Sequence, residues 1–301
     1  MEYKNHITFF EKDHVKLTNY LKATDIKYDC NDTFCSFDIL ESNKHWKAIS
    51  KILKRYKRWY LTETIFTKEE LNAAEWLSVR SIFRFDYPQP EDEYQEITYN
   101  GQKCDECNGG LIQIDSFRFK KAPKLKNRHF FTTNWKDEVL FLSEDAKSKI
   151  ENMNIPGISY KEVKNKTGTK IFPDIYQLVV DNILPEGLIQ DLSSVDEKTI
   201  CKKCGRTRYS PAKRGQLVYF KETFDNAPDI VQTYEIFGNG GYNQRKILLG
   251  KKVYQLIIDN KMDRALKFEP IKLISKNDFS KKTDNSKKGK ILTYLKNIFK
   301  N

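Results

Sequence analysis

The sequence of 301 residues predicts an α+β protein with an N-terminal unit and a longer body built around two pairs of cysteines. Three observations lead to this fold class. Apolar runs and amphipathic segments alternate over the segment 1–66, two C-x-x-C pairs lie far apart in the chain, and a strand–helix–strand pattern follows each pair. We therefore expect a unit over residues 1–66, a body over 67–274 and a basic tail over 275–301.

The segment 1–66 predicts the order strand, helix, strand, strand, helix, strand. Leu17 and Leu21 are four positions apart, as on one face of a helix, and Asn31-Asp32 is a turn between two apolar runs. This order is the one that a ferredoxin-like sandwich requires, so we expect that fold. The predicted strands are 7–10, 26–30, 34–39 and 59–66, and the predicted helices are 12–22 and 43–57.

A further helix is predicted to begin at Thr67. Thr67 and Glu70 have the T-x-x-E spacing of a capping box, in which each residue satisfies a free backbone N–H of the first helical turn. Apolar residues follow at helical spacing, at Leu71, Ala74 and Leu77. We therefore expect the helix to extend through Leu77.

Four of the six cysteines form two pairs, Cys104 with Cys107 and Cys201 with Cys204. Thiolates at positions i and i+3 chelate one metal ion, and the glycine that follows each pair within two positions lets backbone amides turn toward the sulfurs. A single C-x-x-C can also be a redox dithiol. Two pairs without a thioredoxin-like βαβ pattern favour a structural zinc ion held by Cys104, Cys107, Cys201 and Cys204.

The predicted centre is closed and negatively charged. Four thiolates around Zn²⁺ leave a local charge of −2, and Lys202, Lys203 and Arg206 beside the second pair would offset it. A centre with four protein ligands has no open position at which water could be activated. The remaining cysteines, Cys30 and Cys35, fall in the first predicted strand pair, where we interpret them as ordinary buried thiols.

The body is predicted to contain two similar halves, at about 96–163 and 196–274. After each cysteine pair come an apolar strand, a short helix and a second strand, and the two copies of this pattern can be aligned with each other along the chain. Ile150 and Ile257 are equivalent helical positions in this alignment. We interpret the pattern as an internal duplication around one shared zinc ion.

The net charge of +12 is weak evidence for a nucleic-acid partner, because half of it comes from eight lysines and two aspartates in the tail. The segment 44–60 mixes lysines and arginines with aromatic residues, which is typical of a surface that grips phosphates and stacks bases. Its aromatic residues also follow helical spacing and can be core. Nucleic-acid binding through Lys54, Arg55 and Arg58 therefore stays open as the alternative function.

Catalytic and membrane-binding motifs are weak in this sequence. The glycine cluster at 237–242 precedes a predicted strand rather than a helix, so we interpret it as a loop and not as a phosphate-binding site. The C-terminal segment 291–301 predicts a basic amphipathic helix that docks on the body, on a partner or on an anionic surface. No apolar run is long enough to cross a bilayer and the N-terminus lacks a signal sequence, so we expect a cytoplasmic protein that is not an enzyme.

The segments Cys104–Val163 and Cys201–Ile271 resemble the bacterial double-CxxCG-motif proteins, which include immunity proteins of polymorphic and contact-dependent toxin systems. The resemblance implies a non-catalytic protein that binds and neutralises a cognate toxin domain. Only the four paired cysteines carry over, as metal ligands. The first pair departs from the motif, because it reads Cys-Asp-Glu-Cys-Asn-Gly.

Overall fold

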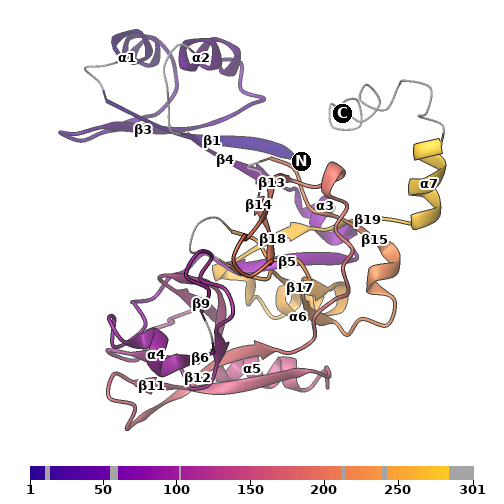
Figure 1. The fold of residues 1–301 in the computed structure, drawn as a ribbon. Coiled ribbons are helices and arrows are strands. Elements are labelled where there is room, and N and C mark those ends of the chain that lie inside the picture. Colours follow the sequence, from indigo (N-terminus) through magenta and orange to yellow (C-terminus); the bar gives the residue numbers. More distant parts are fainter. Residues whose placement is uncertain (11–13, 55–59, 102, 212–213, 239–242, 285–301) are drawn as a thin grey trace. The chain divides into compact units, whose positions relative to one another are not determined.

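The structure is a computed structural model that describes residues 1–10, 14–54, 60–101, 103–211, 214–238 and 243–284. It is a mixed α+β protein with several antiparallel sheets (Figure 1). The chain divides into two compact units. The first comprises Met1–Glu70 with Ala212–Gln216, and the second comprises Leu71–Pro211 with Leu217–Asn301.

The first unit has its strands and helices in the predicted order. The elements are β1 (Glu2–Phe9), α1 (Val15–Lys22), β2 (Asp29–Cys30), β3 (Cys35–Leu40), α2 (Trp46–Leu53) and β4 (Tyr60–Ile65). The strands form one sheet in the order β2-β3-β1-β4, and every neighbouring pair is antiparallel.

Both helices of the first unit cover the same face of its sheet (Figure 1). Ile7 and Phe37 from the strands pack against Leu17 of α1 and Ile49 of α2, and all four side chains are buried. The period of two along each strand leaves the opposite face to side chains such as His6 of β1. One face of this sheet is therefore a core face and the other is polar.

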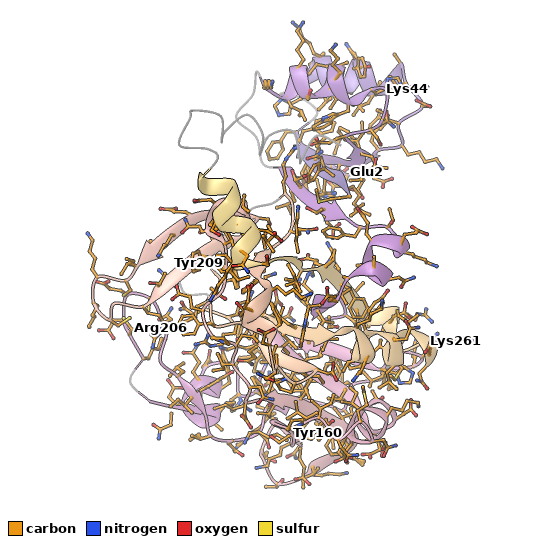
Figure 2. The ribbon with its side chains drawn as sticks, turned by 90° about the vertical axis from the view of Figure 1, so that its right-hand side faces the viewer. Glu2, Lys44, Tyr160, Arg206, Tyr209 and Lys261 are labelled. Atoms are coloured by element: carbon orange, nitrogen blue, oxygen red, sulfur yellow. A yellow bond between two sulfur atoms is a disulfide. The ribbon has the colours of Figure 1, made fainter. Side chains whose placement is uncertain are left out.

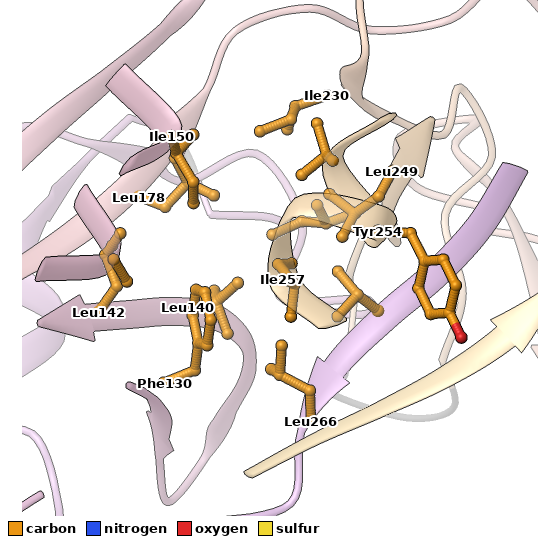
Figure 3. Close-up of a cluster of buried hydrophobic side chains, with 14 of the residues drawn as sticks. Phe130, Leu140, Leu142, Ile150, Leu178, Ile230, Leu249, Tyr254, Ile257 and Leu266 are labelled. Atoms are coloured by element: carbon orange, nitrogen blue, oxygen red, sulfur yellow. The ribbon is translucent and has the colours of Figure 1, made fainter. Parts of the chain in front are cut away.

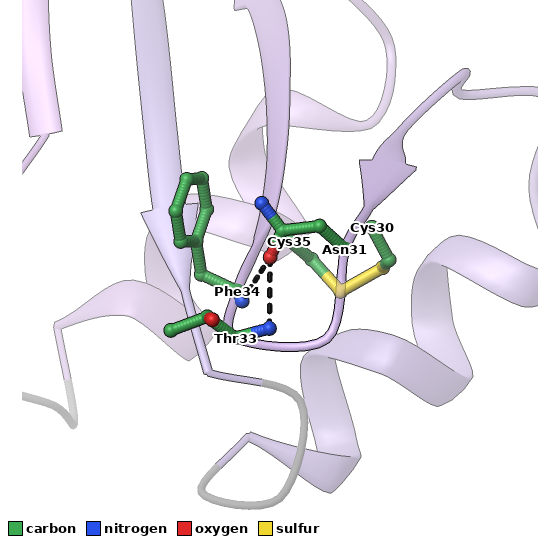
Figure 4. Close-up of a disulfide and its surroundings, with 5 residues drawn as sticks. All are labelled: Cys30, Asn31, Thr33, Phe34 and Cys35. Carbon is green, nitrogen blue, oxygen red and sulfur yellow. Dashed lines mark hydrogen bonds between the residues drawn. A yellow bond between two sulfur atoms is a disulfide. The ribbon is translucent and has the colours of Figure 1, made fainter.

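Cys30 and Cys35 are not two buried thiols, as predicted, but a disulfide (Figure 4). They lie opposite each other in the β2–β3 hairpin, where Cys35 is buried and Cys30 is exposed. The side chain of Asn31 accepts hydrogen bonds from the backbone N–H groups of Thr33 and Phe34, both at 2.8 Å. The turn predicted at Asn31-Asp32 brings the two sulfurs together, which the interpretation as free thiols did not take into account.

The capping box at Thr67 is confirmed, but the helix behind it is shorter than predicted. Thr67 N donates to Glu70 Oε2 at 2.9 Å and Glu70 N donates to Thr67 Oγ1 at 3.2 Å. The helix α3 (Lys68–Ala73) then ends, and Leu77 lies in a strand, β5 (Trp76–Ser81). The strand is favoured because β5 pairs on both edges and Leu77 is fully buried there.

The second unit contains two larger sheets. The four-stranded sheet has the order β16-β17-β5-β18 and the five-stranded sheet has the order β8-β11-β12-β10-β9. Their strands are β8 (Arg118–Phe119), β9 (Phe130–Thr133), β10 (Lys136–Ser143), β11 (Ile158–Asn165), β12 (Ile171–Val180), β16 (Ile230–Gln232), β17 (Ile247–Gly250) and β18 (Leu266–Pro270).

Each larger sheet contains one of the two predicted strand–helix–strand segments. In the first, α5 (Glu144–Glu151) connects β10 to β11, and β12 pairs antiparallel with both strands. In the second, α6 (Lys251–Asp259) connects β17 to β18, and β5 pairs antiparallel with both. Ile150 of α5 and Ile257 of α6 belong to one buried cluster that also includes Leu142, Leu178 and Leu249 (Figure 3).

Two short hairpins of the second unit carry the cysteine pairs. The first pair lies between β6 (Tyr99–Asn100) and β7 (Ile112–Gln113), and the second lies between β13 (Val195–Ile200) and β14 (Thr207–Pro211). The remaining elements are α4 (Tyr94–Thr98), the 3₁₀ turns η1 (Gln190–Leu192), η2 (Lys221–Phe224) and η3 (Asp263–Ala265), the parallel pair β15 (Val218–Phe220) and β19 (Lys272–Ile274), and α7 (Lys276–Asp284).

The beginning of the predicted tail forms the helix α7, on which Phe279 packs edge-on against Phe220 with the ring centroids 5.4 Å apart. The amphipathic helix predicted for the segment 291–301 lies outside the described residues. Among the described residues, none of the helices has the length and apolar character that crossing a bilayer requires.

The carboxylate of Asp115 is expected to make the stability of the second unit depend on acid pH. Burial raises the pKa of Asp115, but hydrogen bonds from Lys164 (2.8 Å), Arg118 (2.9 Å) and the Ser116 N–H (2.7 Å) outweigh it and lower that pKa to about 2. An unfolded chain binds this proton with a pKa of about 3.9. The stabilisation is therefore complete above about pH 5 and is lost as the pH falls through the folded-state pKa.

Asp115→Asn should lower the free energy of unfolding by about 1–2 kcal/mol at pH 7, a modest loss because the carboxylate is partly exposed. At pH 2.5 the loss should be much smaller, because the carboxylate is then largely protonated in the unfolded chain and in part of the folded protein. Urea denaturation at the two pH values measures the difference. Asp181→Asn, at an exposed carboxylate, is the control. An equal loss at both pH values would contradict the prediction.

Candidate metal centre

The structure brings the four paired cysteines together at the tips of the two hairpins. Their sulfurs all lie within 4.8 Å of one another, with 3.7 Å between Cys104 and Cys201 and 3.5 Å between Cys107 and Cys204. Sulfurs placed tetrahedrally at about 2.3 Å from one ion would be roughly 3.8 Å apart. Three of the cysteines are buried and Cys204 is exposed. This cluster can hold a metal ion.

Both cysteine pairs adopt the same backbone turn. The N–H of Cys104 donates to the carbonyl of Gly109 at 2.9 Å, and the N–H of Asn108 donates to the carbonyl of Cys104 at 2.7 Å. In the second pair, Cys201 N–H donates to Arg206 O at 3.0 Å and Gly205 N–H donates to Cys201 O at 2.9 Å. The two loops therefore present their sulfurs in the same way, although only the cysteines are identical between them.

The residue after the second cysteine of each pair has a left-handed backbone. Asn108 has φ of +54° and Gly205 has φ of +70°. Glycine adopts this conformation without steric strain, and asparagine is among the few other residues that adopt it readily. The departure of the first pair from C-x-x-C-G is therefore a change of residue and not of conformation.

Arg206 joins the two pairs, as the charge argument anticipated. Its Nη1 donates toward Cys204 Sγ at 3.7 Å and Cys107 Sγ at 3.9 Å, so one guanidinium lies against a sulfur of each pair. Figure 2 labels Arg206. A side chain at Gly109 would place its Cβ only 2.4 Å from this Nη1. Glycine at position 109 therefore leaves the room that Arg206 needs.

Lys203 also connects the two loops, which was not predicted, and three further residues of the site, Asp105, Glu106 and Asn243, were missed. The ammonium of Lys203 pairs with Asp105, and its backbone N–H donates to Glu106 Oε2 at 3.2 Å. Lys203 therefore joins the two loops to each other, and the charge of its ammonium also interacts with Cys104, as the charge argument expected. Asn243, 136 positions beyond Cys107, donates its side-chain N–H to the Cys107 carbonyl. No local sequence pattern marks Asn243, whose role depends on the folded chain.

The thiols of the cluster differ in acidity when no ion is bound. The backbone N–H of Cys107 points toward the sulfur of Cys104 and is the main reason that the pKa of Cys104 is lowered to about 7. The backbone N–H of Cys204 acts in the same direction on Cys201, but burial and the neighbouring sulfurs outweigh it and raise the pKa of Cys201 to about 12. Its thiol lies 3.4 Å from the Glu106 carboxylate.

The residues of the alternative nucleic-acid surface lie in the other unit. Lys54 follows the last residue of α2 and is exposed, whereas Arg55 and Arg58 lie outside the described residues. Trp46 packs against the core cluster of the first unit, so this aromatic residue is core, as preferred from its spacing. The glycine cluster at 237–242 is described only as far as Gly238.

Comparisons with known proteins identify no family for this chain. No protein-family model matches the sequence, and no curated protein matches it significantly.

A reciprocal exchange tests the shared turn. Asn108→Gly and Gly205→Asn should change the free energy of unfolding by no more than about 0.5 kcal/mol, because both residues accept a positive φ. Asn108→Val and Gly205→Val should each cost about 1–3 kcal/mol, because a β-branched residue is strained there. At Gly205 a steric clash with neighbouring residues would not contribute to this cost, because an added Cβ would meet no atom within 4 Å.

Chemical denaturation of the metal-loaded protein measures the four variants, and competition with a chelator measures metal retention. If Asn108→Gly were as harmful as Asn108→Val, the amide side chain of Asn108 would be required, and the explanation from backbone conformation would be wrong.

Proposed function

We propose that the four-cysteine cluster binds one structural Zn²⁺ ion. The support is a ligand set of four sulfurs close to tetrahedral spacing, and two matching turns in which backbone N–H groups point toward the sulfurs of Cys104 and Cys201. Arg206, placed against two sulfurs, would compensate the negative charge of the loaded centre. With four protein ligands the ion would join the hairpins and leave no position for a substrate.

We also propose specific folds for the two units. Sheet order β2-β3-β1-β4, with both helices on one face, supports a ferredoxin-like sandwich for the first unit. In the second unit, an internal duplication is supported by α5 and α6, each of which connects two strands that flank a third, antiparallel one. In the first half the third strand, β12, comes after β10, α5 and β11 in the chain. In the second half the third strand, β5, comes before β17, α6 and β18.

We infer that the protein is a non-catalytic binding protein of the immunity type, which neutralises a cognate toxin domain by forming a stoichiometric complex. The observation that carries the inference is the matching geometry of the two cysteine turns. Because Asn108 takes the left-handed conformation of a glycine, both pairs are equivalent to the CxxCG motif on which the resemblance rests. The zinc ion then has the purely structural role that a binding scaffold needs.

A cytoplasmic location belongs to the same proposal. Clustered cysteines without disulfides among them suit a reducing compartment, where thiolates are available for zinc. The disulfide between Cys30 and Cys35 would be a dithiol under those conditions. Mass spectrometry after alkylation in intact cells distinguishes the two states.

Binding of nucleic acid remains the second candidate, and the outer face of α2 is the observation in its favour. Lys47, Lys51 and Lys54 are exposed there, while Ile49 and Leu53 face the core. The polar face of the first sheet adds little to this candidate, because its described strands carry no Phe, Tyr or Trp on that face for bases to stack on.

Elemental analysis of freshly purified protein should find one zinc ion per chain. Cys107→Ser should reduce the metal content to well below one and lower the melting temperature strongly, because Cys107 is fully buried and the ion closes a long loop of the chain. Cys30→Ser, outside the cluster, should leave the metal content unchanged. Protein with neither zinc nor iron would contradict the proposal.

The two candidate functions differ in how binding responds to salt. A toxin domain encoded next to this gene should bind one-to-one with an affinity that changes little between about 50 and about 300 mM salt, because a packed interface carries the complex. Binding of duplex DNA through lysines should instead weaken by about 0.9 log units per log unit of salt for each phosphate contacted. Calorimetric titrations measure both.

Lys54→Ala combined with Arg55→Ala and Arg58→Ala should leave binding of the toxin domain intact. A salt-sensitive, sub-micromolar affinity for DNA or RNA that this triple variant abolishes would favour the second candidate.

A further inference from the structure

The turn between β9 and β10 presents an aromatic platform in the second unit. The ring of Trp135 lies 4.6 Å from that of Tyr87 and stacks on Tyr94 at 5.7 Å, measured between ring centroids. Tyr94 is 6% exposed, whereas Trp135 and Tyr87 are 42% and 38% exposed. The buried Tyr94 therefore supports the ring of Trp135, which in turn packs against Tyr87, and the last two rings are partly exposed to solvent.

The backbone holds Trp135 in a conformation that bulky residues rarely adopt. Its φ is +66°, a value at which glycine or asparagine is the usual occupant. The turn is fixed by the carbonyl of Asp86, which accepts hydrogen bonds from Asn134 N (3.0 Å), Asn134 Nδ2 (2.9 Å) and Thr133 Oγ1 (2.9 Å). Strain of this kind is concentrated at functional sites. A glycine would suit this backbone better, so the turn itself does not require a tryptophan.

The chain beside the platform is acidic, although the whole protein is basic. Residues 86–96 contain five carboxylates and no lysine or arginine, against a net charge of +12 for the chain. Glu91 is neutralised by Lys120 at 2.7 Å. Asp92 and Glu93 are exposed and directly precede Tyr94, which stacks on Trp135. Two exposed negative charges are therefore adjacent in the chain to the tyrosine on which Trp135 stacks.

We propose that Trp135 and Tyr87 are the docking anchor for a lysine or arginine side chain of a basic protein partner. A cation over an aromatic face is attracted by the ring, most strongly by tryptophan, and the carboxylates of Asp92 and Glu93 add attraction and steering. Tryptophan and tyrosine in a fixed geometry are also the residues that dominate the affinity of protein interfaces. The proposal rests on the proposed function for the partner being a protein, and it identifies the surface and the charge of that partner.

Fluorine NMR of the full-length, zinc-loaded protein tests the anchor directly. All four tryptophans are labelled with 5-fluorotryptophan, and Trp135→Phe assigns the resonance of Trp135. The probe is a short peptide of alternating lysine and glycine, and the matched peptide has glutamine in place of lysine. The Trp135 resonance should shift with the lysine peptide, with an affinity at least about 10-fold higher than for the glutamine peptide.

Trp135→Gly and the pair Asp92→Asn with Glu93→Gln separate binding from stability. Trp135→Gly removes the ring and suits the positive φ, so its melting temperature should stay within about 4 °C of the parent. Its affinity for the cognate toxin domain should fall at least about 10-fold. The double variant Asp92→Asn with Glu93→Gln should bind the lysine peptide more weakly than the parent does, and its weak binding of the glutamine peptide should be unchanged.

Three results would overturn the anchor. They are a Trp135 resonance that does not move with the lysine peptide, equal shifts with both peptides, and a shift produced by single-stranded oligonucleotide in their place. The proposed function fails separately. If Trp135→Gly binds the toxin domain as tightly as the parent, only the anchor is wrong; if no toxin domain binds the parent while the lysine peptide does, only the toxin assignment is wrong.

Discussion

Four thiols held within 4.8 Å of one another are the constraint on which the second unit depends. Thiolates at that distance repel, so the cluster cannot ionise fully without a compensating cation. The opposite shifts in the pKa of Cys104, to about 7, and of Cys201, to about 12, express that conflict within one cluster. A bound divalent ion would remove the conflict, and Arg206 relieves part of it by donating to one sulfur of each pair.

The hairpins that carry the thiols depend in turn on the two larger sheets. The helices α5 and α6 contribute Ile150 and Ile257 to a single buried cluster, and the apolar surface removed from water there is the main favourable term that keeps the sheets together. The ion pairs of Asp115 attach the end of the first hairpin to β11 through Lys164. The cysteine turns are therefore supported by a scaffold whose hydrophobic core contains none of the four cysteines, and a bound ion would add a cross-link between the two tips.

How much of this structure could be predicted from the sequence depends on how far apart in the chain the interacting residues are. The element order of the first unit and the capping box at Thr67 follow from periodicity and short spacings, and both were predicted. Leu77 was assigned to a helix because its neighbours have helical spacing, but β5 pairs on both edges with strands that lie far along the chain, at 247–250 and 266–270. No local pattern contains that information.

The same distinction holds at the cysteines. The four sulfurs could be grouped from the C-x-x-C spacing alone, and Arg206 could be found because it follows the second pair by two positions. Asn243 could not be found, since its contact with Cys107 exists only in the folded chain. The disulfide of Cys30 and Cys35 was missed for a different reason. Its signal was local, in the Asn31 turn that sets the two strands opposite each other, but a cytoplasmic context made free thiols the expected state.

The way in which charge is distributed along the chain says more about function than the net charge does. Half of the net charge of +12 lies in the tail, while the segment 86–96, which includes Tyr87 and Tyr94 of the platform, contains five carboxylates and no lysine or arginine, and one of these carboxylates, Glu91, pairs with Lys120. A protein that used its overall charge to bind a polyanion would gain nothing from an acidic segment next to its best stacking surface, because phosphates would be repelled there. A basic protein partner would be attracted to that segment and would find two fixed aromatic rings beside it. The local charge and the strained Trp135 therefore favour protein binding over nucleic-acid binding, on grounds independent of the cysteine motif.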